Sequence, residues 1–218
     1  TLHFVSLMQI ASISSYQRKY RKTLVCVVEL DSGEKLELEP ETAVRFDLRT
    51  RDTLDETKYQ AIRAFDEKKK CIAEAMNLIS LRPRSRQELQ ERFLRKGYSS
   101  ESVEDSLTKL MANGYLNDAE FARRWSRSKL KKKSIGRNTL QFELRKKGIS
   151  GDVINSVMKE IYSVHNEFED ALAAANKKIR TYRDEDVSAI RSKLMRFLHQ
   201  RGFSQENIRA VLDRLLNK

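Results

Sequence analysis

Basic side chains form two clusters in this sequence, and their density is its strongest chemical feature. The first cluster surrounds Pro83 in a predicted turn and consists of Arg82, Arg84 and Arg86. The second spans residues 121–147, where eleven basic residues face a single acid, Glu143, so that 27 residues carry a net charge of +10. Its basic members are Arg123, Arg124, Arg127, Lys129, Lys131, Lys132, Lys133, Arg137, Arg145, Lys146 and Lys147. Such residues often lie on a solvated surface without a partner, but charge of one sign at this density repels itself, which favours contact with a polyanion.

Residues that could carry catalysis or bind a metal form no recognisable constellation. The sequence contains no phosphate-cradling glycine loop, no Gly-x-Ser-x-Gly motif and no cluster of His, Cys and Asp. The histidines His3, His165 and His199 are far apart, and His199 is interpreted as a cationic or hydrogen-bonding residue near a helix end. We therefore expect a protein that is not an enzyme and has no cofactor.

The cysteines and the apolar runs bear on the cellular compartment. Cys26 and Cys71 match no metal or redox spacing, so we predict buried free thiols in a reducing compartment. No run approaches the ~20 apolar residues of a membrane span, and the start lacks the pattern of a secretory signal. A cytoplasmic protein without membrane contact is expected. Because the chain begins at Thr1, we also expect its first seven residues to be an upstream extension, with Met8 as the start.

An apolar frame that occurs three times predicts the elements that position the basic clusters. Counted from Gly97, Gly148 and Gly202, apolar residues stand eight and four positions before the glycine and one, six, ten and thirteen after it. All eighteen positions are apolar: Leu89, Phe93, Tyr98, Val103, Leu107, Leu110; Leu140, Leu144, Ile149, Ile154, Met158, Ile161; Leu194, Leu198, Phe203, Ile208, Leu212, Leu215. Intervals of 51 and 54 residues between the glycines indicate serial repeats.

Each of these glycines is predicted to end one helix and let a second helix pack back on it, because glycine readily adopts the left-handed conformation of a helix terminus. The residue after the glycine should then contact the residue five positions earlier. The predicted contacts are Phe93 with Tyr98, Leu144 with Ile149, and Leu198 with Phe203. The serines predicted to cap the following helices are Ser99, Ser150 and Ser204.

A further helix is predicted before each copy of the frame. The first runs from Thr57 to about Ser80, the second follows Asn117, and the third covers residues 167–182. Residues 85–88 read as a capping box. Trp125 is expected to pack in the core of the second repeat, with stacking on a base or partner as the alternative.

The N-terminal residues predict a small β-sheet. Residues 23–30 and 35–39 indicate a hairpin across Asp31-Ser32-Gly33, residues 10–16 a third strand, and residues 44–48 a short further element. Such a sheet buries too little to be stable by itself, so it should lean on the first helices. We predict a mainly α protein with a β-rich extension at 1–57 and helical repeats at 58–118, 119–165 and 166–218.

The positive charge belongs to the helical part. The whole chain has a net charge of +12, whereas residues 1–58 contain nine Lys/Arg and ten Asp/Glu, a net charge of −1. The remaining residues therefore carry +13, which again indicates a polyanionic partner.

Three stretches resemble the RecX family, whose members regulate the RecA recombinase. They are residues 114–123 (GYLNDAEFAR), residues 82–85 (RPRS) with Glu88 and Leu89, and residues 143–149 (ELRKKGI). The similarity covers residues 70–218. It implies three tandem three-helix repeats in a curved, elongated monomer that lies in the groove of the RecA–DNA filament and controls its growth, disassembly and activity. One departure is residues 131–136 (KKKSIG), where many members have a proline-containing loop.

Two functions are consistent with these features. The first is a non-enzymatic regulator of RecA, expected to inhibit it, whose two basic clusters contact acidic RecA surface, single-stranded DNA within the filament, or both. The alternative is a DNA-binding protein that acts without RecA, because short helices with a basic stripe also suit a helix-turn-helix-like binder. The first requires effects on RecA at sub-stoichiometric amounts, whereas the second predicts tight DNA binding by the chain alone.

Overall fold

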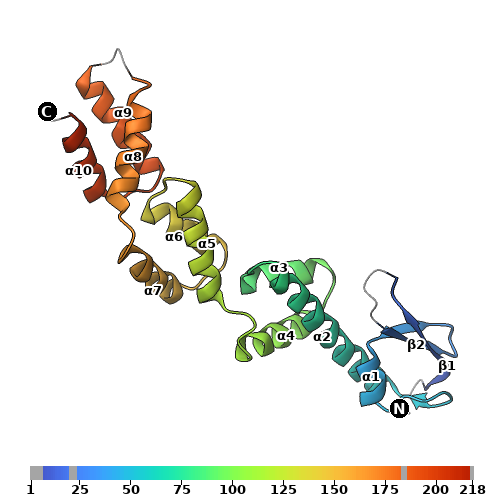
Figure 1. The fold of residues 1–218 in the computed structure, drawn as a ribbon. Helices are drawn as coiled ribbons and strands as arrows, with labels where there is room; N and C mark the ends of the chain where they lie inside the picture. Colours follow the sequence, from blue (N-terminus) through green and yellow to red (C-terminus); the bar gives the residue numbers. More distant parts are fainter. Residues whose placement is uncertain (1–6, 20–23, 183–185, 217–218) are drawn as a thin grey trace, which may run out of the picture. The chain divides into compact units, whose positions relative to one another are not determined.

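The computed structural model describes residues 7–19, 24–182 and 186–216. They form two compact units: residues 7–81 with 90–115, and residues 82–89 with 116–216. Figure 1 shows the strands and helices along the chain. Helix α3 (Arg86–Arg95) is divided between the units. Most of the predicted upstream extension, including His3, lies outside the described residues.

A four-stranded antiparallel sheet begins the first unit. Strands β1 (Met8–Gln17), β2 (Leu24–Leu30), β3 (Lys35–Leu38) and β4 (Thr53–Leu54) follow the order β3-β2-β1-β4. The predicted hairpin and third strand are confirmed, and Gly33 provides the turn with a φ of +84°. The alternation of charged and apolar residues in β3 matches its burial: Leu36 and Leu38 are buried, whereas Lys35 and Glu37 are exposed.

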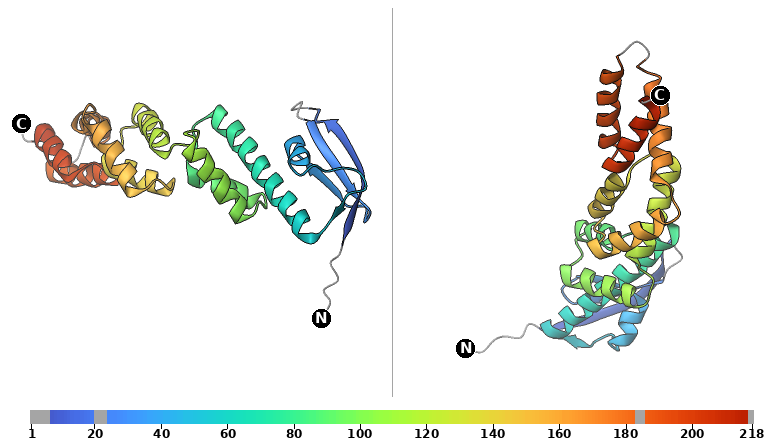
Figure 2. Two further views of the ribbon diagram at one scale, coloured as in Figure 1. Left: turned by 90° about the horizontal axis from the view of Figure 1, so that it is seen from below. Right: turned by 90° about the vertical axis from the view of Figure 1, so that its left-hand side faces the viewer.

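Helix α1 (Pro40–Arg45) corrects the prediction of a short element over residues 44–48. The helix begins four residues earlier because Pro40, whose fixed φ suits the first helical turn, stands at its start. Figure 2 shows α1 beside the strands. It is joined to the next helix by the buried Asp66, which accepts hydrogen bonds from the Glu39 N–H (2.7 Å) and the Thr42 hydroxyl (2.8 Å).

Helix α2 (Glu56–Leu81) connects the sheet to the helical region, within one residue of its predicted bounds. Its first turns contribute Tyr59 and Ile62 to the core of the sheet, so the sheet does lean on the first helix. Further along, Glu67 accepts hydrogen bonds from the Ser99 N–H (2.8 Å) and hydroxyl (2.6 Å). Burial raises the pKa of Glu67, but the hydrogen bonds from Ser99 and Ser102 lower it by a larger amount. The pKa of Glu67 is therefore lowered overall.

Helix α3 begins at a half-formed capping box. The Ser85 hydroxyl accepts a hydrogen bond from the Glu88 N–H (3.2 Å), as predicted, but the Glu88 carboxylate binds Arg82 and Arg84 instead of completing the box. Helix α4 (Ser100–Ala112) is capped by Ser99, which accepts from the Ser102 N–H (3.3 Å). It packs against α2, and the Ser106 hydroxyl donates to the Lys68 carbonyl (3.2 Å).

The second unit contains two successive sets of three helices. The first set is α5 (Asp118–Lys132), α6 (Arg137–Lys146) and α7 (Gly151–Tyr162). The second set is α8 (Glu167–Ile179), α9 (Val187–Gln200) and α10 (Gln205–Leu216), so α8 ends three residues before its predicted end. Each set encloses its own apolar core, and Trp125 packs against the first of them, as expected.

The repeated frame has the predicted structure in all three copies. Gly97, Gly148 and Gly202 have φ values of +88°, +75° and +77°. The next residue donates a backbone hydrogen bond to the carbonyl five positions earlier: Tyr98 to Phe93 (3.2 Å), Ile149 to Leu144 (3.2 Å), Phe203 to Leu198 (3.3 Å). Of the eighteen frame positions, all are buried except Tyr98 and Leu215, which are half-buried. Ser150 and Ser204 cap α7 and α10. The glycine stops and capping serines are therefore confirmed.

Carboxylates at the start of α5 and α8 make equivalent contacts in the second unit. Asp118 accepts a hydrogen bond from the Arg86 backbone N–H (2.8 Å), and Glu167 accepts one from the Arg137 backbone N–H (2.7 Å). Each acceptor therefore satisfies a free N–H at the start of a helix in the preceding repeat. Burial raises the pKa of Asp118, although the Arg86 N–H opposes this shift.

Candidate anion-binding surface

Helix α5 carries the first half of the second basic cluster. Asn117 caps it by accepting a hydrogen bond from the Glu120 N–H (3.0 Å). Phe121, Ala122 and Ser126 are buried, whereas the helical period places Arg124 and Arg127 outward. Arg124 and Arg127 are accordingly 64% and 62% exposed.

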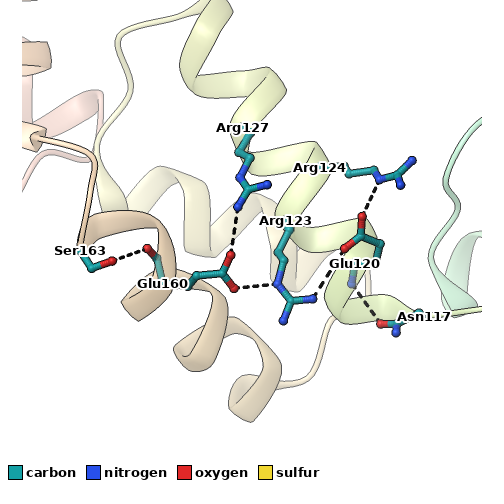
Figure 3. A network of polar contacts seen from close by, with 7 residues as sticks. All are labelled: Asn117, Glu120, Arg123, Arg124, Arg127, Glu160 and Ser163. Atoms are coloured by element: carbon teal, nitrogen blue, oxygen red, sulfur yellow. Dashed lines mark hydrogen bonds and ion pairs between the residues drawn. The ribbon is translucent and has the colours of Figure 1, made fainter.

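The α5 arginines are paired with acids that lie outside the 121–147 segment. Glu160 of α7 binds the Arg123 Nε (2.7 Å) and an Arg127 terminal nitrogen (3.0 Å), as Figure 3 shows. Glu120 binds the Arg124 Nε (2.6 Å), and this hydrogen bond is the main reason that the pKa of Glu120 is lowered. Glu143 is the single acid within residues 121–147, but the three arginines of α5 are ion-paired with acids from outside this segment.

Lys129 and Arg137 are also held by neighbours. The Lys129 ammonium is 2.7 Å from the Glu143 carboxylate and 4.7 Å from the centre of the Trp125 ring. The Arg137 guanidinium lies over the Tyr162 ring at 4.6 Å. The Tyr162 ring does not neutralise the Arg137 charge, which can still attract an anion, whereas the Lys129 charge is offset by Glu143.

Seven cations of the cluster have no ion pair among the described residues: Arg137, which stacks on Tyr162, and six cations at the ends of two helices. Lys131, Lys132 and Lys133 form the last turn and the end of α5, and Arg145, Lys146 and Lys147 occupy the same place on α6. All six are exposed. Their position suits the negative end of a helix dipole, but this interaction is weak at an exposed helix end and leaves each ammonium or guanidinium open to a partner. We refer to these six residues as the unpaired cationic surface.

Two arginines of the cluster around Pro83 are held by a carboxylate of the same region. Arg82 and Arg84 both bind the Glu88 carboxylate, and the Arg84 side chain is only 14% exposed. Burial raises the pKa of Glu88, but the hydrogen bonds from the two arginines outweigh it, so that this pKa is lowered. Arg86 is half-buried, and its backbone N–H binds Asp118. Arg84 is therefore paired and largely buried, and Arg82 is paired but exposed.

The structure adds basic residues that the sequence pattern did not single out. Lys177 and Lys178 of α8 and Arg201 after α9 line one pocket together with Lys132 and Lys133. In the sequence, Arg201 has a sufficient explanation as a cation at a helix terminus, and Lys177–Lys178 form only a doublet. Their proximity to residues 132 and 133 depends on how the two helix sets of the second unit pack.

Metal-binding groups and membrane-spanning helices were sought among the described residues. Within it, no group of three or more His, Cys, Asp or Glu is placed to hold a metal ion. His165 contacts Asp170 (Nε2 to Oδ2 2.6 Å), and His199 is exposed near the end of α9. Cys26 and Cys71 are buried free thiols, as predicted, and burial raises the pKa of Cys71 to about 11. The described helices include none with the length and apolar character required to cross a membrane.

Comparison with known proteins decides the family. Models of the first, second and third three-helix domains of RecX match residues 71–110, 117–158 and 166–212. A protein named "Regulatory protein RecX" from Pelodictyon phaeoclathratiforme is 38% identical over 144 residues, which cover 65% of this chain and 86% of that protein. This chain belongs to the RecX family.

Other members match almost the whole chain, including the sheet. The "Regulatory protein RecX" of Listeria welshimeri is 28% identical over 204 residues, covering 94% of this chain and 74% of its own. A structure titled "Crystal structure of regulatory protein RecX" superposes with a TM-score of 0.74 at 23% identity, over 94% of this chain and 99% of that one. RecX from Lactobacillus salivarius gives a TM-score of 0.63 at 20% identity, over 69% of this chain and 97% of its own. The first of these structures shares the fold over almost the whole chain, and the second shares it over about two thirds of the chain.

Proposed function

We propose that this protein is a non-enzymatic regulator that binds the RecA–DNA filament in its groove and inhibits RecA. Membership of a family of regulatory proteins supports the regulatory role. The link to RecA comes from what the family resemblance implies.

The observation that carries the proposal is the unpaired cationic surface at the ends of α5 and α6. A filament of recombinase on DNA presents phosphates at regular intervals. Exposed lysines and arginines without an internal counter-ion can neutralise such phosphates and release condensed counter-ions. The ion-paired Arg123, Arg124 and Arg127 would have to exchange Glu120 or Glu160 for the partner. They are therefore assigned a secondary role, and a protein partner with its own carboxylates is the more suitable contact for them.

The proposal is tested by titrating the full chain into a RecA–single-stranded-DNA ATPase assay. We expect ATP hydrolysis to fall when far fewer chains than RecA subunits are present. The reason is that one chain bound in the groove affects the addition of many further RecA subunits to the filament. Unchanged ATP hydrolysis and strand exchange at equimolar chain would refute it. Stimulation at sub-stoichiometric amounts would retain the RecA target and reverse the sign of the effect.

The same unpaired cationic surface favours a second candidate, a DNA-binding protein that acts without RecA. This function predicts tight binding of an oligodeoxynucleotide by the chain alone, with an affinity that falls steeply as salt is raised. Binding of this kind combined with no effect on RecA would support the second candidate over the first.

A further inference from the structure

A basic pocket lies between the two helix sets of the second unit. It has a volume of about 670 Å³ and is formed by residues 132–135 at and beyond the end of α5, by α8, and by the end of α9. Five cations line it: Lys132, Lys133, Lys177, Lys178 and Arg201. No acid is among its described lining residues. Its volume falls in the range of pockets that hold small ligands, roughly 300–1,000 Å³.

Arg201 is fixed in this pocket by its neighbours. Its guanidinium donates a hydrogen bond to the Ser134 carbonyl (3.0 Å) and lies over the Phe197 ring at 4.8 Å. Its own carbonyl accepts a hydrogen bond from the Gly136 N–H (2.9 Å). A guanidinium held in this way has lost its conformational freedom before any ligand arrives, which lowers the entropic cost of binding.

The four lysines place flexible positively charged side chains around the fixed guanidinium of Arg201. Lys132, Lys133 and Lys177 are exposed, and none of the three has an ion pair among the described residues. Lys178 is half-buried and stacks on Tyr182 (5.3 Å) and Phe197 (5.8 Å), which guide its ammonium without neutralising it. Five like charges around one concavity repel one another and concentrate a positive potential there. An anionic ligand in the pocket would relieve this repulsion.

We propose that this pocket binds closely spaced phosphate groups. The planar guanidinium of arginine can donate paired N–H bonds to two oxygens of a phosphate, and lysines add point charges around it. A triphosphate and the backbone of a single-stranded nucleic acid both present this chemistry. The proposal goes beyond both candidate functions above because it names a defined site. This site adds Lys177, Lys178 and Arg201 to Lys132 and Lys133 of the basic cluster.

The test measures binding by the full chain alone, with inorganic triphosphate and a short single-stranded oligodeoxynucleotide as separate probes in calorimetry. The variant is Lys177→Gln with Lys178→Gln, which removes two charges and keeps most of each stem. The matched control is Arg196→Gln with Arg209→Gln, two exposed cations of the same helix set outside the pocket. The conservative variant Lys177→Arg with Lys178→Arg retains both charges, and thermal melting verifies that each variant is folded.

We expect the Lys177→Gln, Lys178→Gln variant to bind at least one probe roughly tenfold more weakly, since each lost charge-assisted contact is partly screened by solvent. The control should lose less than threefold, and the arginine variant should bind like the native chain. If triphosphate binds and displaces the oligonucleotide, the ligand is a compact polyphosphate; if only the oligonucleotide binds, the phosphates belong to a nucleic acid.

Three results would overturn the proposal: no binding of either probe, equal losses in the variant and its control, or tighter binding of a glutamate-rich peptide than of both probes. Because RecA is absent, these outcomes are independent of the ATPase result. A chain that binds triphosphate and leaves RecA unaffected would retain the pocket and remove the proposed function.

Discussion

Alanine at Gly202 tests whether the two helix sets of the second unit meet through direct backbone contact. Gly202 has a φ of +77°, where a residue with a Cβ costs about 1–2 kcal/mol. A Cβ at this position would also lie 2.3 Å from the Thr139 Oγ1 and 2.4 Å from the Thr139 backbone nitrogen. The start of α6 would have to move, and overpacking of this kind costs typically about 1–3 kcal/mol. We therefore expect Gly202→Ala to lower the free energy of unfolding by about 2–5 kcal/mol.

Two other glycines separate the backbone cost from the steric cost. Gly97 has a φ of +88°, but no described atom lies within 4 Å of its Cβ position, so Gly97→Ala should cost only the backbone term of about 1–2 kcal/mol. Gly136 has an ordinary φ of −82°, yet its Cβ would lie 2.2 Å from the Gly202 carbonyl oxygen. Gly136→Ala should therefore cost only the steric term.

The measurement is chemical denaturation combined with hydrogen exchange of individual segments, because a chain with two compact units need not unfold in one step. We expect Gly202→Ala and Gly136→Ala to accelerate exchange in α6 and α9–α10, and Gly97→Ala to accelerate it in α3 and α4. Equal destabilisation by Gly202→Ala and Gly97→Ala, with unchanged exchange in α6, would refute direct packing of Gly202 on Thr139.

Three further predictions concern charge and the sheet. Glu160→Gln should release Arg123 and Arg127 and tighten binding of single-stranded DNA roughly two- to threefold at low salt, while changing stability by less than ~1 kcal/mol, because exposed ion pairs contribute little. The pKa of Glu67 is lower in the folded protein than its usual value of 4.5, so its carboxylate stabilises the fold above that pH, and the stability advantage over Glu67→Gln should vanish as the pH falls through the folded pKa. Deleting residues 1–57 should leave the helices folded but lower the melting temperature, because Tyr59 and Ile62 lose the core that they share with the sheet.

A different outcome would contradict each of these three predictions. For Glu160→Gln the control is Glu169→Gln, an exposed acid with no described partner, and an equal gain in DNA affinity would show that only net charge matters. For Glu67 a difference in unfolding free energy that stays constant between pH 6 and pH 3 would contradict the hydrogen bonds from Ser99. For the deletion, loss of all helical circular dichroism would show that the helices cannot fold without the sheet.

The local structure of the helical region could be predicted because it depends on neighbours in sequence. A glycine after an apolar run ends a helix, and a serine two residues later caps the next one, whatever the rest of the chain does. The same local reasoning would have found α1, because proline at position 40 is a helix-start signal. The short element was instead predicted over residues 44–48, from their apolar residues. Strand β4 has two residues and no sequence pattern of its own.

The electrostatics of the site could not be predicted, because they depend on which helices pack together. Glu160 lies thirteen residues beyond the basic segment, yet α7 packs against α5 and brings its carboxylate to Arg123 and Arg127. A count along the sequence therefore overestimates the free charge of α5. It also misses Lys177 and Lys178, whose approach to Lys132 and Lys133 requires the packing of the second unit.

A triple variant tests most directly whether the unpaired cationic surface is required for inhibition of RecA. Changing Lys131, Lys132 and Lys133 to alanine removes three exposed charges outside the apolar frame, so the chain should remain folded. Lys159→Ala, Arg196→Ala and Arg209→Ala together form the control, with the same loss of charge at other exposed positions. Both are titrated into the RecA–single-stranded-DNA ATPase assay, and their DNA affinity is measured against salt.

We predict that the Lys131–Lys133 variant requires several times more protein than the control to inhibit ATP hydrolysis. Its DNA affinity should fall regardless of base sequence. The slope of log affinity against log salt should flatten by up to about 2 on single strands, since each neutralised phosphate contributes about 0.7. If the Lys131–Lys133 variant retains both its full DNA affinity and its full effect on RecA, these lysines lie on a solvated face and are not required for inhibition of RecA.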